Sequence, residues 1–521
     1  MKTLMKLISS MLLLIILLSL FISCADDTVK TADTQAAGDN TGEKSEDTAP
    51  AQLQPDVPET DFGGYKFRIM TRDAQHEKWQ TIDVYSEGAN GDPINDAVYE
   101  RNRMLEEEFN VVVTSVPVFN PGTEIKKYIL ANDDVVDVVT ESLGGVGLST
   151  LSVENLLADY NDVDYINYNQ PWWDTNLIEG FSIKNKVYYL TGDISIMDNY
   201  GTWAICFNKD MAADHNLPNP YELVENGTWT YDAMFDMMKP IPKDLDGNGV
   251  VDDTDQFGFI GESFNMYALL AGAGTKITTK NNDDLPELTI FTERNMSALD
   301  KVAMLMTDKS MTLLSDNVTG KYTSIFNECI NKNFGEGKVL FWMGSMYVIG
   351  VLRQYDVNFG LLPAPKYDEQ QENYYGTFSN SNCTAYSIPI TNPDYNRTGL
   401  LLEAMAAYSM YTLTPAYNET TLIGKSFRDS ESEAMLGLIF SSRLYDLGTI
   451  YGWGEMFNTI RQMATNTTIN FASQYASLEV SAQTALISLS HRWIDGNGKI
   501  NQKPGKRLSL IGLVLWRLEL M

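Results

Sequence analysis

The sequence predicts an α/β protein built as two lobes. The chain beyond Asp61 runs for about 460 residues, more than one hydrophobic core usually serves, so two cores are expected. Between residues 65 and 140, segments with strand-like and helix-like patterns alternate. That alternation is typical of a parallel sheet covered by helices.

The predicted elements of this region follow the order strand, helix, strand, helix, strand. They span residues 65–71, 94–109, 110–118, 123–131 and 135–140. The first segment alternates apolar and polar residues, and the second repeats apolar residues at helical spacing. The third is rich in β-branched residues, and the last is a short apolar run that fits a buried strand.

Two loops follow the first and third predicted strands, at residues 71–73 and 141–145. Ligands of parallel sheets bind beyond the carboxyl ends of the strands. These loops carry Arg72 and Glu141. The guanidinium of Arg72 offers several hydrogen-bond donors and the carboxylate of Glu141 two acceptors, a combination that suits vicinal hydroxyl groups. We predict that both side chains contact a ligand; the alternative for each is a solvated loop position.

Residues 1–24 have the pattern of a secretory signal peptide. Two lysines precede an apolar run over residues 11–22, which is too short to span a membrane and is soon followed by a polar stretch. The pair Ser23-Cys24 resembles the lipobox of bacterial lipoproteins, in which the cysteine carries the lipid. We expect Cys24 to anchor the protein on the extracytoplasmic face of the cell membrane; the alternative is ordinary secretion.

Residues 25–61 contain almost no large apolar side chains. Such a segment cannot bury enough surface to offset its conformational entropy. It is predicted to be a disordered tether that lets the folded body stand off the membrane.

Charge and cysteine content exclude several classes of protein. The chain carries 38 basic and 69 acidic residues, a net charge of −31, which disfavours nucleic acid as a partner. Beyond Cys24 the cysteines are Cys206, Cys329 and Cys383, with no spacing typical of a zinc site or a disulfide framework, and we expect them to be buried apolar side chains. The sequence has no nucleophile elbow, phosphate-binding loop or dinucleotide fingerprint.

Residues 244–255 form a 12-residue acidic loop. Oxygen-bearing side chains fall at positions 1, 3, 5, 9 and 12, a glycine falls at position 6, and position 7 can offer its carbonyl. The predicted ligands are Asp244, Asp246, Asn248, Val250, Asp252 and Asp255. Since calcium takes roughly six to eight hard oxygens, we predict one structural Ca²⁺. The alternative is a surface turn without metal.

Five later segments carry a resemblance to a known family. They are residues 201–210, ending in Phe-Asn-Lys-Asp; 229–232, Trp-Thr-Tyr-Asp; 337–344; 358–365, which ends in a Pro-x-Pro turn; and 385–389. In this order they resemble the extracellular solute-binding proteins of carbohydrate ABC importers, of the maltodextrin-binding-like kind. The resemblance covers roughly residues 62–490.

The resemblance implies a two-lobed fold of the periplasmic-binding-protein type II class. Each lobe would be a mixed sheet flanked by helices, with a cleft between the lobes. Residues 62–195 plus 338–383 would form one lobe, residues 196–337 plus 384–490 the other, and residues 491–521 an atypical tail. The protein would act as a monomer that closes over a sugar or oligosaccharide and delivers it to an ABC permease.

Hinge closure would occur near residues 193–202 and 380–387, and Asp193, just before the first crossing, is a predicted ligand residue. Trp173, Trp203 and Trp342 are predicted to stack on sugar rings, with burial in the core as an equal alternative. For Trp173 the argument is that it follows Trp172, and neighbours on a strand point to opposite faces, so one of the two should be exposed.

Two other functions stay open at this point. A receptor of the same fold could bind a peptide or another small solute, because fold alone does not determine function. A secreted glycan-active enzyme or an adhesin is also compatible, since two carboxylates suffice for glycoside hydrolysis and the chain has many.

Overall fold

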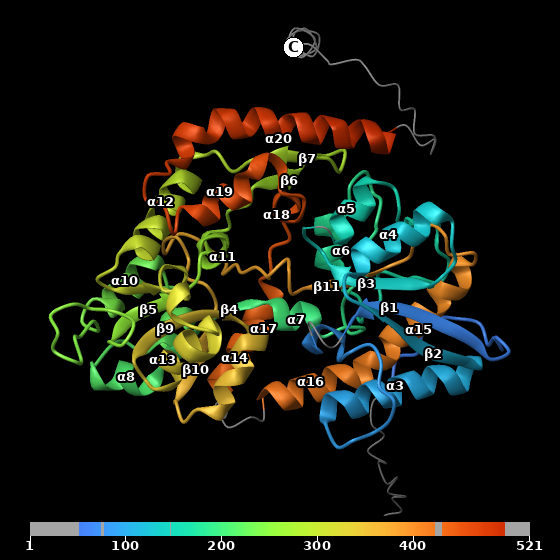
Figure 1. Ribbon diagram of the computed structural model, residues 1–521, viewed down its shortest axis with the longest axis horizontal. Coiled ribbons are helices and arrows are strands. Elements are labelled where there is room, and N and C mark those ends of the chain that lie inside the picture. The colour runs from blue at the N-terminus through green and yellow to red at the C-terminus, as the bar shows by residue number, and fades with distance from the viewer. Residues whose placement is uncertain (1–51, 74–77, 146, 423–429, 495–521) are drawn as a thin grey trace, which may run out of the picture. The chain divides into compact units, whose positions relative to one another are not determined.

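The computed structural model describes residues 52–73, 78–145, 147–422 and 430–494 (Figure 1). The predicted signal peptide, Cys24 and most of the predicted tail lie outside these residues. Residues 52–61 of the predicted tether form no helix or strand, but Val57 packs against the apolar cluster that includes Phe67 and Val111. Among the described helices, none is both long enough and apolar enough to cross a membrane.

The first sheet has four strands in the order β11-β3-β1-β2. Their bounds are β1 Tyr65–Arg72, β2 Val111–Val118, β3 Val138–Ser142 and β11 Thr384–Ser387. β1 pairs in parallel with β2 and β3, whereas β11 runs antiparallel to β3. The three strands predicted for this region are confirmed.

Two capped helices connect the strands of the first sheet. In α3 (Pro93–Phe109) the carboxylate of Asp92 accepts from the backbone of the first turn, and Asn110 ends the helix in the left-handed conformation. In α4 (Pro121–Ala131) the side chain of Asn120 caps the start in the same way. Both helices have proline in the first turn, where its missing N–H costs nothing.

The second sheet has five strands in the order β10-β4-β9-β5-β8. Their bounds are β4 Trp203–Asn208, β5 Phe257–Gly261, β8 Thr312–Leu314, β9 Val339–Ser345 and β10 Phe359–Leu362. β9, β5 and β8 are parallel neighbours, and β4 and β10 join antiparallel. Both sheets are therefore mixed, as expected.

We call the first sheet with its helices the first lobe, and the second sheet with its helices the second lobe. In the first lobe, α3, α15 and α16 pack together on one side of the sheet, and α4 lies on the other with α5 (Figure 1). The remaining helices of the first lobe are α5 (Leu148–Val153), α6 (Thr175–Phe181), α15 (Tyr395–Tyr411) and α16 (Leu413–Leu422).

The second lobe is the more helical of the two, and a two-stranded hairpin of β6 (Thr278–Lys280) and β7 (Pro286–Leu288) lies beside its long last helix (Figure 1). Its helices are α8 (Lys209–Asp214), α9 (Pro220–Glu225), α10 (Tyr231–Met238), α11 (Asn265–Gly272), α12 (Glu293–Thr307), α13 (Asn331–Gly335), α14 (Met346–Gly350), α17 (Ser430–Ser441), α18 (Leu447–Tyr451), α19 (Met456–Gln462) and α20 (Phe471–Ile494).

The strand pairing corrects the predicted lobe boundaries. β9 and β10, within the predicted first-lobe segment 338–383, belong to the second sheet. β11, at the start of the predicted second-lobe segment 384–490, pairs with β3 in the first sheet. The prediction was wrong here because it assigned these segments by analogy, whereas a strand's partner is decided by long-range pairing.

The described chain passes between the lobes at two places. The short helix α7 (Met197–Gly201) lies in the first crossing, within the predicted hinge 193–202. The second crossing joins β10 to β11 and ends within the predicted hinge 380–387. α16 belongs to the first lobe and α17 to the second, and residues 423–429 between them lie outside the described residues.

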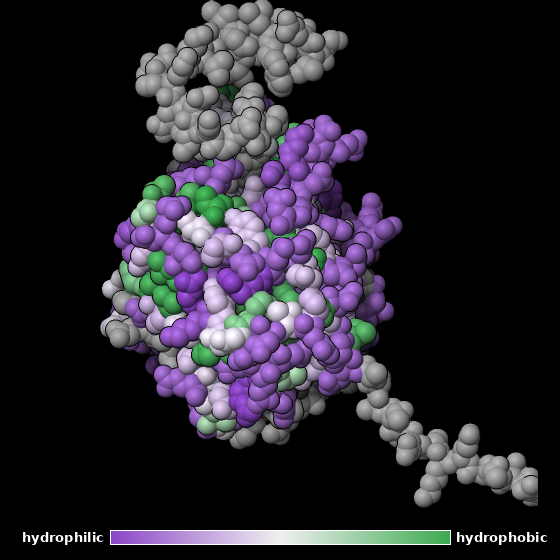
Figure 2. Space-filling model, turned by 90° about the vertical axis from the view of Figure 1, so that its right-hand side faces the viewer, coloured by the Kyte–Doolittle hydropathy of each residue, from purple (hydrophilic) through white to green (hydrophobic). Residues whose placement is uncertain are grey.

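The cores are apolar, and the surface is mainly polar. Cys206, Cys329 and Cys383 are buried free thiols, as expected. The face drawn in Figure 2 is mostly hydrophilic with scattered apolar residues.

Candidate ligand-binding site

Two neighbouring cavities lie where elements of the two lobes meet. The inner pocket is small, about 40 Å³, and the outer groove is about 340 Å³. Thr449 lines the inner pocket and the next residue, Ile450, lines the outer groove. The two cavities therefore meet at the second-lobe helix α18.

Aromatic side chains dominate the inner pocket. Trp203 comes from the start of β4, Phe264 and Tyr267 come from the region of α11, and Phe457 comes from α19. The opposite wall is the second crossing, residues 377–381. Of the predicted ligand residues, Trp203 is the one that this pocket includes.

The outer groove lies between α5 of the first lobe and α18 and α20 of the second. Its first-lobe wall consists of Gly145, Ser149, Thr150, Val153 and Glu154, and its second-lobe wall of Ile450, Tyr451, Trp453, Ala485 and Ser488. The first-lobe wall follows the carboxyl end of β3, where the sequence predicted a ligand-binding loop.

The loop after β3 depends on glycine. A Cβ on Gly147 would stand 2.0 Å from the carbonyl oxygen of Ser142, so no other residue fits without a shift of the backbone. The backbone N–H of Gly144 donates to the carbonyl of Asn380 in the second crossing (3.3 Å). The loop therefore lies directly against the crossing that lines the inner pocket.

Tyr451 and Trp453 form a stacked pair on the wall of the outer groove. Their ring centroids are 4.9 Å apart, and the rings are tilted by 2°. The turn between and after them depends on two glycines with positive φ, Gly452 and Gly454. A Cβ on Gly454 would meet the carbonyl of Leu478 in α20 at 2.4 Å.

The sequence analysis missed this pair. The alternation of aromatic residues and glycine over residues 451–454 was the signal that could have identified it.

The outer groove carries little net charge. Glu154 is the acidic side chain that lines it, and Lys126 of α4 pairs with its carboxylate at 2.7 Å. Ser149 and Thr150 add hydroxyl groups. The groove can therefore form hydrogen bonds to a neutral ligand beside an apolar ring surface.

A second group missed by the sequence analysis lies at the carboxyl ends of β5 and β8. Glu262 directly follows β5, and burial raises its pKa to about 7, with Asp316 adding a smaller increase. The backbone N–H of Ser263 donates to Asp316 (2.7 Å). Arg461 lies over the ring of Phe264, 4.0 Å from its centroid. Glu262 lines neither cavity, and its position after the carboxyl end of a parallel strand is what makes it a candidate ligand group.

Arg72 and Glu141 are brought together by the fold, as their strand ends predicted. Their side chains form an ion pair at 2.8 Å, and Glu141 is almost fully buried. The carboxylate of Glu141 also accepts from the backbone N–H of Gly122 (3.1 Å) and of Ser142 (2.7 Å). Glu141 thus joins α4 to β3, and neither member of the pair lines either cavity.

Asp193 lies at the first crossing, where the hydroxyl of Thr414 in α16 donates to its carboxylate (2.6 Å). Burial raises the pKa of Asp193 to about 6, and the hydrogen bond from Thr414 offsets part of that rise. Asp193 lines neither cavity.

The tryptophans at 172, 173 and 342 are core residues. Trp172 and Trp173 are both buried in the first lobe, and the indole N–H of Trp173 donates to Glu403 (2.8 Å). The expectation that one of the pair is exposed is wrong, because Trp172 lies in a turn and Trp173 forms only an isolated β-bridge with Gly192, so the two do not alternate along a strand. Trp342 is 2% exposed and packs against Phe334 in the second lobe.

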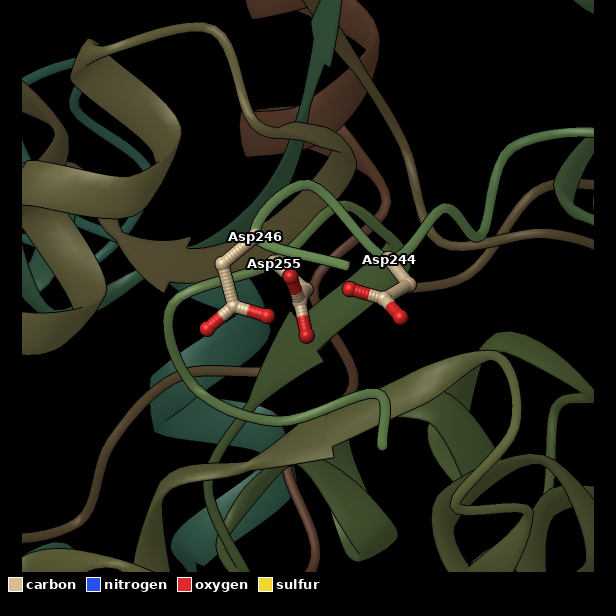
Figure 3. Close-up of side chains that lie close together, drawn as sticks. All are labelled: Asp244, Asp246 and Asp255. Carbon is tan, nitrogen blue, oxygen red and sulfur yellow. The ribbon is translucent and has the colours of Figure 1, made fainter. Parts of the chain in front are cut away.

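The acidic loop brings three of its predicted calcium ligands together. Carboxylate oxygens of Asp244, Asp246 and Asp255 lie within 4.8 Å of one another. Figure 3 shows the three side chains close together on the loop. Asp244 accepts from the backbone N–H of Gly249, which has φ +82°, and this bond forms the sharp turn.

The remaining predicted ligands make local bonds. The carboxylate of Asp252 accepts from the hydroxyl and backbone N–H of Thr254, and the side-chain oxygen of Asn248 accepts from Val250. The convergent oxygens are hard donors on a flexible loop, a set that suits calcium.

Known proteins resemble this chain both in sequence pattern and in fold. A family model described as bacterial extracellular solute-binding protein matches residues 102–414. A cyclo/maltodextrin-binding protein complexed with maltotetraose has a similar structure, with 14% identity, a TM-score of 0.52, and coverage of 84% of this chain and 98% of that one.

A solute-binding protein of an ABC transporter from Thermotoga lettingae, bound with α-D-tagatose, gives 12% identity and a TM-score of 0.50, covering 82% of this chain and 100% of that one. No curated protein matches the chain. The two structural likenesses show the two-lobed fold. Because the family model matches more than half of the sequence, this chain belongs to the bacterial extracellular solute-binding proteins.

Proposed function

We propose that this protein is a lipid-anchored receptor that binds a sugar or oligosaccharide between its lobes and delivers it to an ABC importer by hinge closure. The observation that carries the proposal is the outer groove, in which the stacked pair Tyr451–Trp453 faces the hydroxyl-bearing helix α5.

The chemistry of the groove fits a carbohydrate better than a peptide. Sugar rings have apolar faces that pack on aromatic rings, and their hydroxyl groups need nearby donors and acceptors. The groove supplies both, and its charged residue Glu154 is already paired with Lys126. A peptide receptor would instead need groups that match charged termini. The sugars bound by the two similar structures support the same choice.

The test is a melting-temperature screen of the intact protein with maltotetraose, tagatose, other oligosaccharides and short peptides. We expect at least one saccharide to raise the melting temperature. Trp453→Ala should weaken that saccharide's binding by roughly 1–3 kcal/mol, because a large apolar contact is lost. Trp453 is itself 6% exposed, so its loss should also cost stability. Trp342→Ala, a core change that lines neither cavity, is the matched control and should cost about 3–5 kcal/mol of stability without weakening binding. Stabilisation by peptides alone would favour a peptide receptor and contradict the carbohydrate proposal.

Lipid anchoring is the second part of the proposal, and it depends on Cys24, outside the described residues. A short apolar leader ending in Ser23-Cys24, followed by a polar stretch, supports it. Cys24→Ser should move the protein from the detergent phase to the aqueous phase in a detergent partition. A serine variant that stays in the detergent phase as the parent does would contradict the anchor.

We also propose that the loop at residues 244–255 binds one structural Ca²⁺. The convergence of Asp244, Asp246 and Asp255 supports it, and Asp252 and Asn248 would complete the coordination by turning inward. Excess chelator should lower the melting temperature of the protein, and added calcium should restore it. Asp246→Asn should reduce this response, whereas Asp236→Asn, an exposed position in α10, should leave it intact. An unchanged melting curve in chelator, with no metal found by elemental analysis, would contradict the site.

A further inference from the structure

We infer that Tyr451 is a latch between the lobes, whose hydroxyl holds the outer groove closed. The inference rests on the proposed function, because it assumes that a solute enters between the lobes.

Three hydroxyl groups meet beside the outer groove. The Tyr451 hydroxyl oxygen lies 3.1 Å from the Ser152 hydroxyl and 2.9 Å from that of Tyr189, and the latter two are 2.5 Å apart. Ser152 and Tyr189 are buried. We call these three residues the hydroxyl cluster.

The hydroxyl cluster joins one lobe to the other. Ser152 belongs to α5, and Tyr189 lies next to Leu190, whose backbone pairs with Tyr386 of β11. Both are therefore first-lobe residues. Tyr451 is the last residue of the second-lobe helix α18.

The start of α18 is fixed within the second lobe. The carboxylate of Asp446 caps the helix and also accepts from the backbone N–H groups of Ile277 and Thr278 (2.6 and 3.1 Å). The hydroxyl of Tyr267 donates to the same carboxylate (2.6 Å). Tyr451 is thus carried by a helix that moves with the second lobe.

Each hydroxyl group of the cluster can donate one hydrogen bond to a different acceptor. The Tyr451 hydroxyl can donate to that of Tyr189, which can donate to that of Ser152, which in turn donates to the carbonyl of Ser149 (2.9 Å). Opening the groove removes the first link and leaves the other two within the first lobe. Within the hydroxyl cluster, opening the groove therefore costs the contacts of the Tyr451 hydroxyl and no others.

The Tyr451 ring also lines the outer groove, where the ligand is proposed to bind. It stacks on Trp453, and both rings line the outer groove opposite α5. A solute that enters between α5 and α18 requires these helices to separate, and that separation breaks the cluster. The bond therefore favours the closed arrangement, and a ligand that binds the closed form gains affinity from it.

The test uses Tyr451→Phe, which removes the hydroxyl and keeps the ring. Binding and dissociation are measured with the saccharide probes, maltotetraose first. We expect dissociation to be about threefold to tenfold faster, the size of one lost hydrogen bond. Tyr189→Phe, which removes the acceptor of the crossing bond and does not line the groove, should act in the same direction.

Two matched controls remove a tyrosine hydroxyl bond within one lobe. Tyr160→Phe removes a bond to the carbonyl of Tyr386 in the first lobe, and Tyr231→Phe removes one to the carbonyl of Leu269 in the second. Both should leave ligand dissociation unchanged. Equal dissociation rates for Tyr451→Phe and the wild type would overturn the latch.

A second readout separates the latch from the proposed function. Amide hydrogen exchange of the ligand-free protein should quicken in α5 and α18 of Tyr451→Phe, and not in the two controls. If the wild type binds none of the saccharides, the carbohydrate proposal fails and this readout alone decides the latch. Unchanged exchange in α5 and α18 would then overturn it.

Discussion

Two of the polar contacts between the lobes differ in kind. Beside the outer groove the contact is the neutral hydroxyl cluster of Ser152, Tyr189 and Tyr451. Near the crossings it is charged: Arg443, just before α18, pairs with Asp198 of α7 (3.1 Å) and with Asp174 at the start of α6 (3.3 Å).

The two contacts differ in charge rather than in burial, since Ser152 and Tyr189 are buried as well. All three charged side chains of the Arg443 contact are nearly buried, with 5–11% of their surface exposed. Breaking such a contact is costly because a charge is left without its partner, whereas a hydroxyl can turn to water. The difference teaches that strong contacts suit the region about which the lobes turn, and weak ones suit the opening through which the ligand passes.

The largest expected effect comes from removing the charge at the crossing. Arg443→Ala leaves Asp174 and Asp198 buried without a cation and should lower the free energy of unfolding by about 3–5 kcal/mol. Urea denaturation measures it. The matched control is Arg103→Ala, which breaks an exposed pair with Glu107 on α3 and should cost under about 1 kcal/mol. Equal losses in both variants would remove the distinction between the two regions.

A smaller effect should come from Asp193 at the first crossing. Burial raises its folded pKa to about 6 from a usual value near 4, so the fold favours the protonated form. Its contribution to stability is present below pH 4 and is lost as pH rises through 6.

Asp193→Asn should therefore flatten the fall in stability between pH 4 and pH 6 by about 1–2 kcal/mol. Thermal melts of both proteins across this range check the prediction. Asp236→Asn, at an exposed position, should leave the profile unchanged. If Asp193→Asn instead removed a rise in stability between pH 4 and pH 6, the predicted direction of the effect would be contradicted.

The site residues show how far the sequence could be read. The order of β1, α3, β2, α4 and β3 was predictable, because hydrophobic spacing and caps act locally. The closeness of Arg72 and Glu141 follows from the rule that neighbouring parallel strands end at one edge, whereas their ion pair with each other was not predicted.

The aromatic residues that line the outer groove could not be predicted in this way. Tyr451 and Trp453 lie about 300 residues beyond α5, and only the packing of α18 and α20 places them opposite it. The predicted lobes of β9 and β11 were wrong for the same reason, because the sequence of a single strand does not show which sheet it joins.

The smallest expected effect concerns ligand affinity and pH. Ionised Glu262 can accept hydrogen bonds from ligand hydroxyl groups, and burial raises its pKa to about 7. Affinity should therefore rise up to about tenfold between pH 6 and pH 8, as Glu262 loses its proton. Titration calorimetry at both pH values checks this, and Glu262→Gln should remove the dependence. A variant that keeps the wild-type pH dependence would exclude Glu262 from the ligand.

The central claim is that a saccharide lies between α5 and the Tyr451–Trp453 pair. A crystal structure of the mature chain with the saccharide that most raises its melting temperature tests it directly. We expect a sugar ring about 4 Å from the indole of Trp453, with its hydroxyl groups bonded to α5. A saccharide bound outside both cavities, with the Tyr451–Trp453 pair free of ligand, would contradict it.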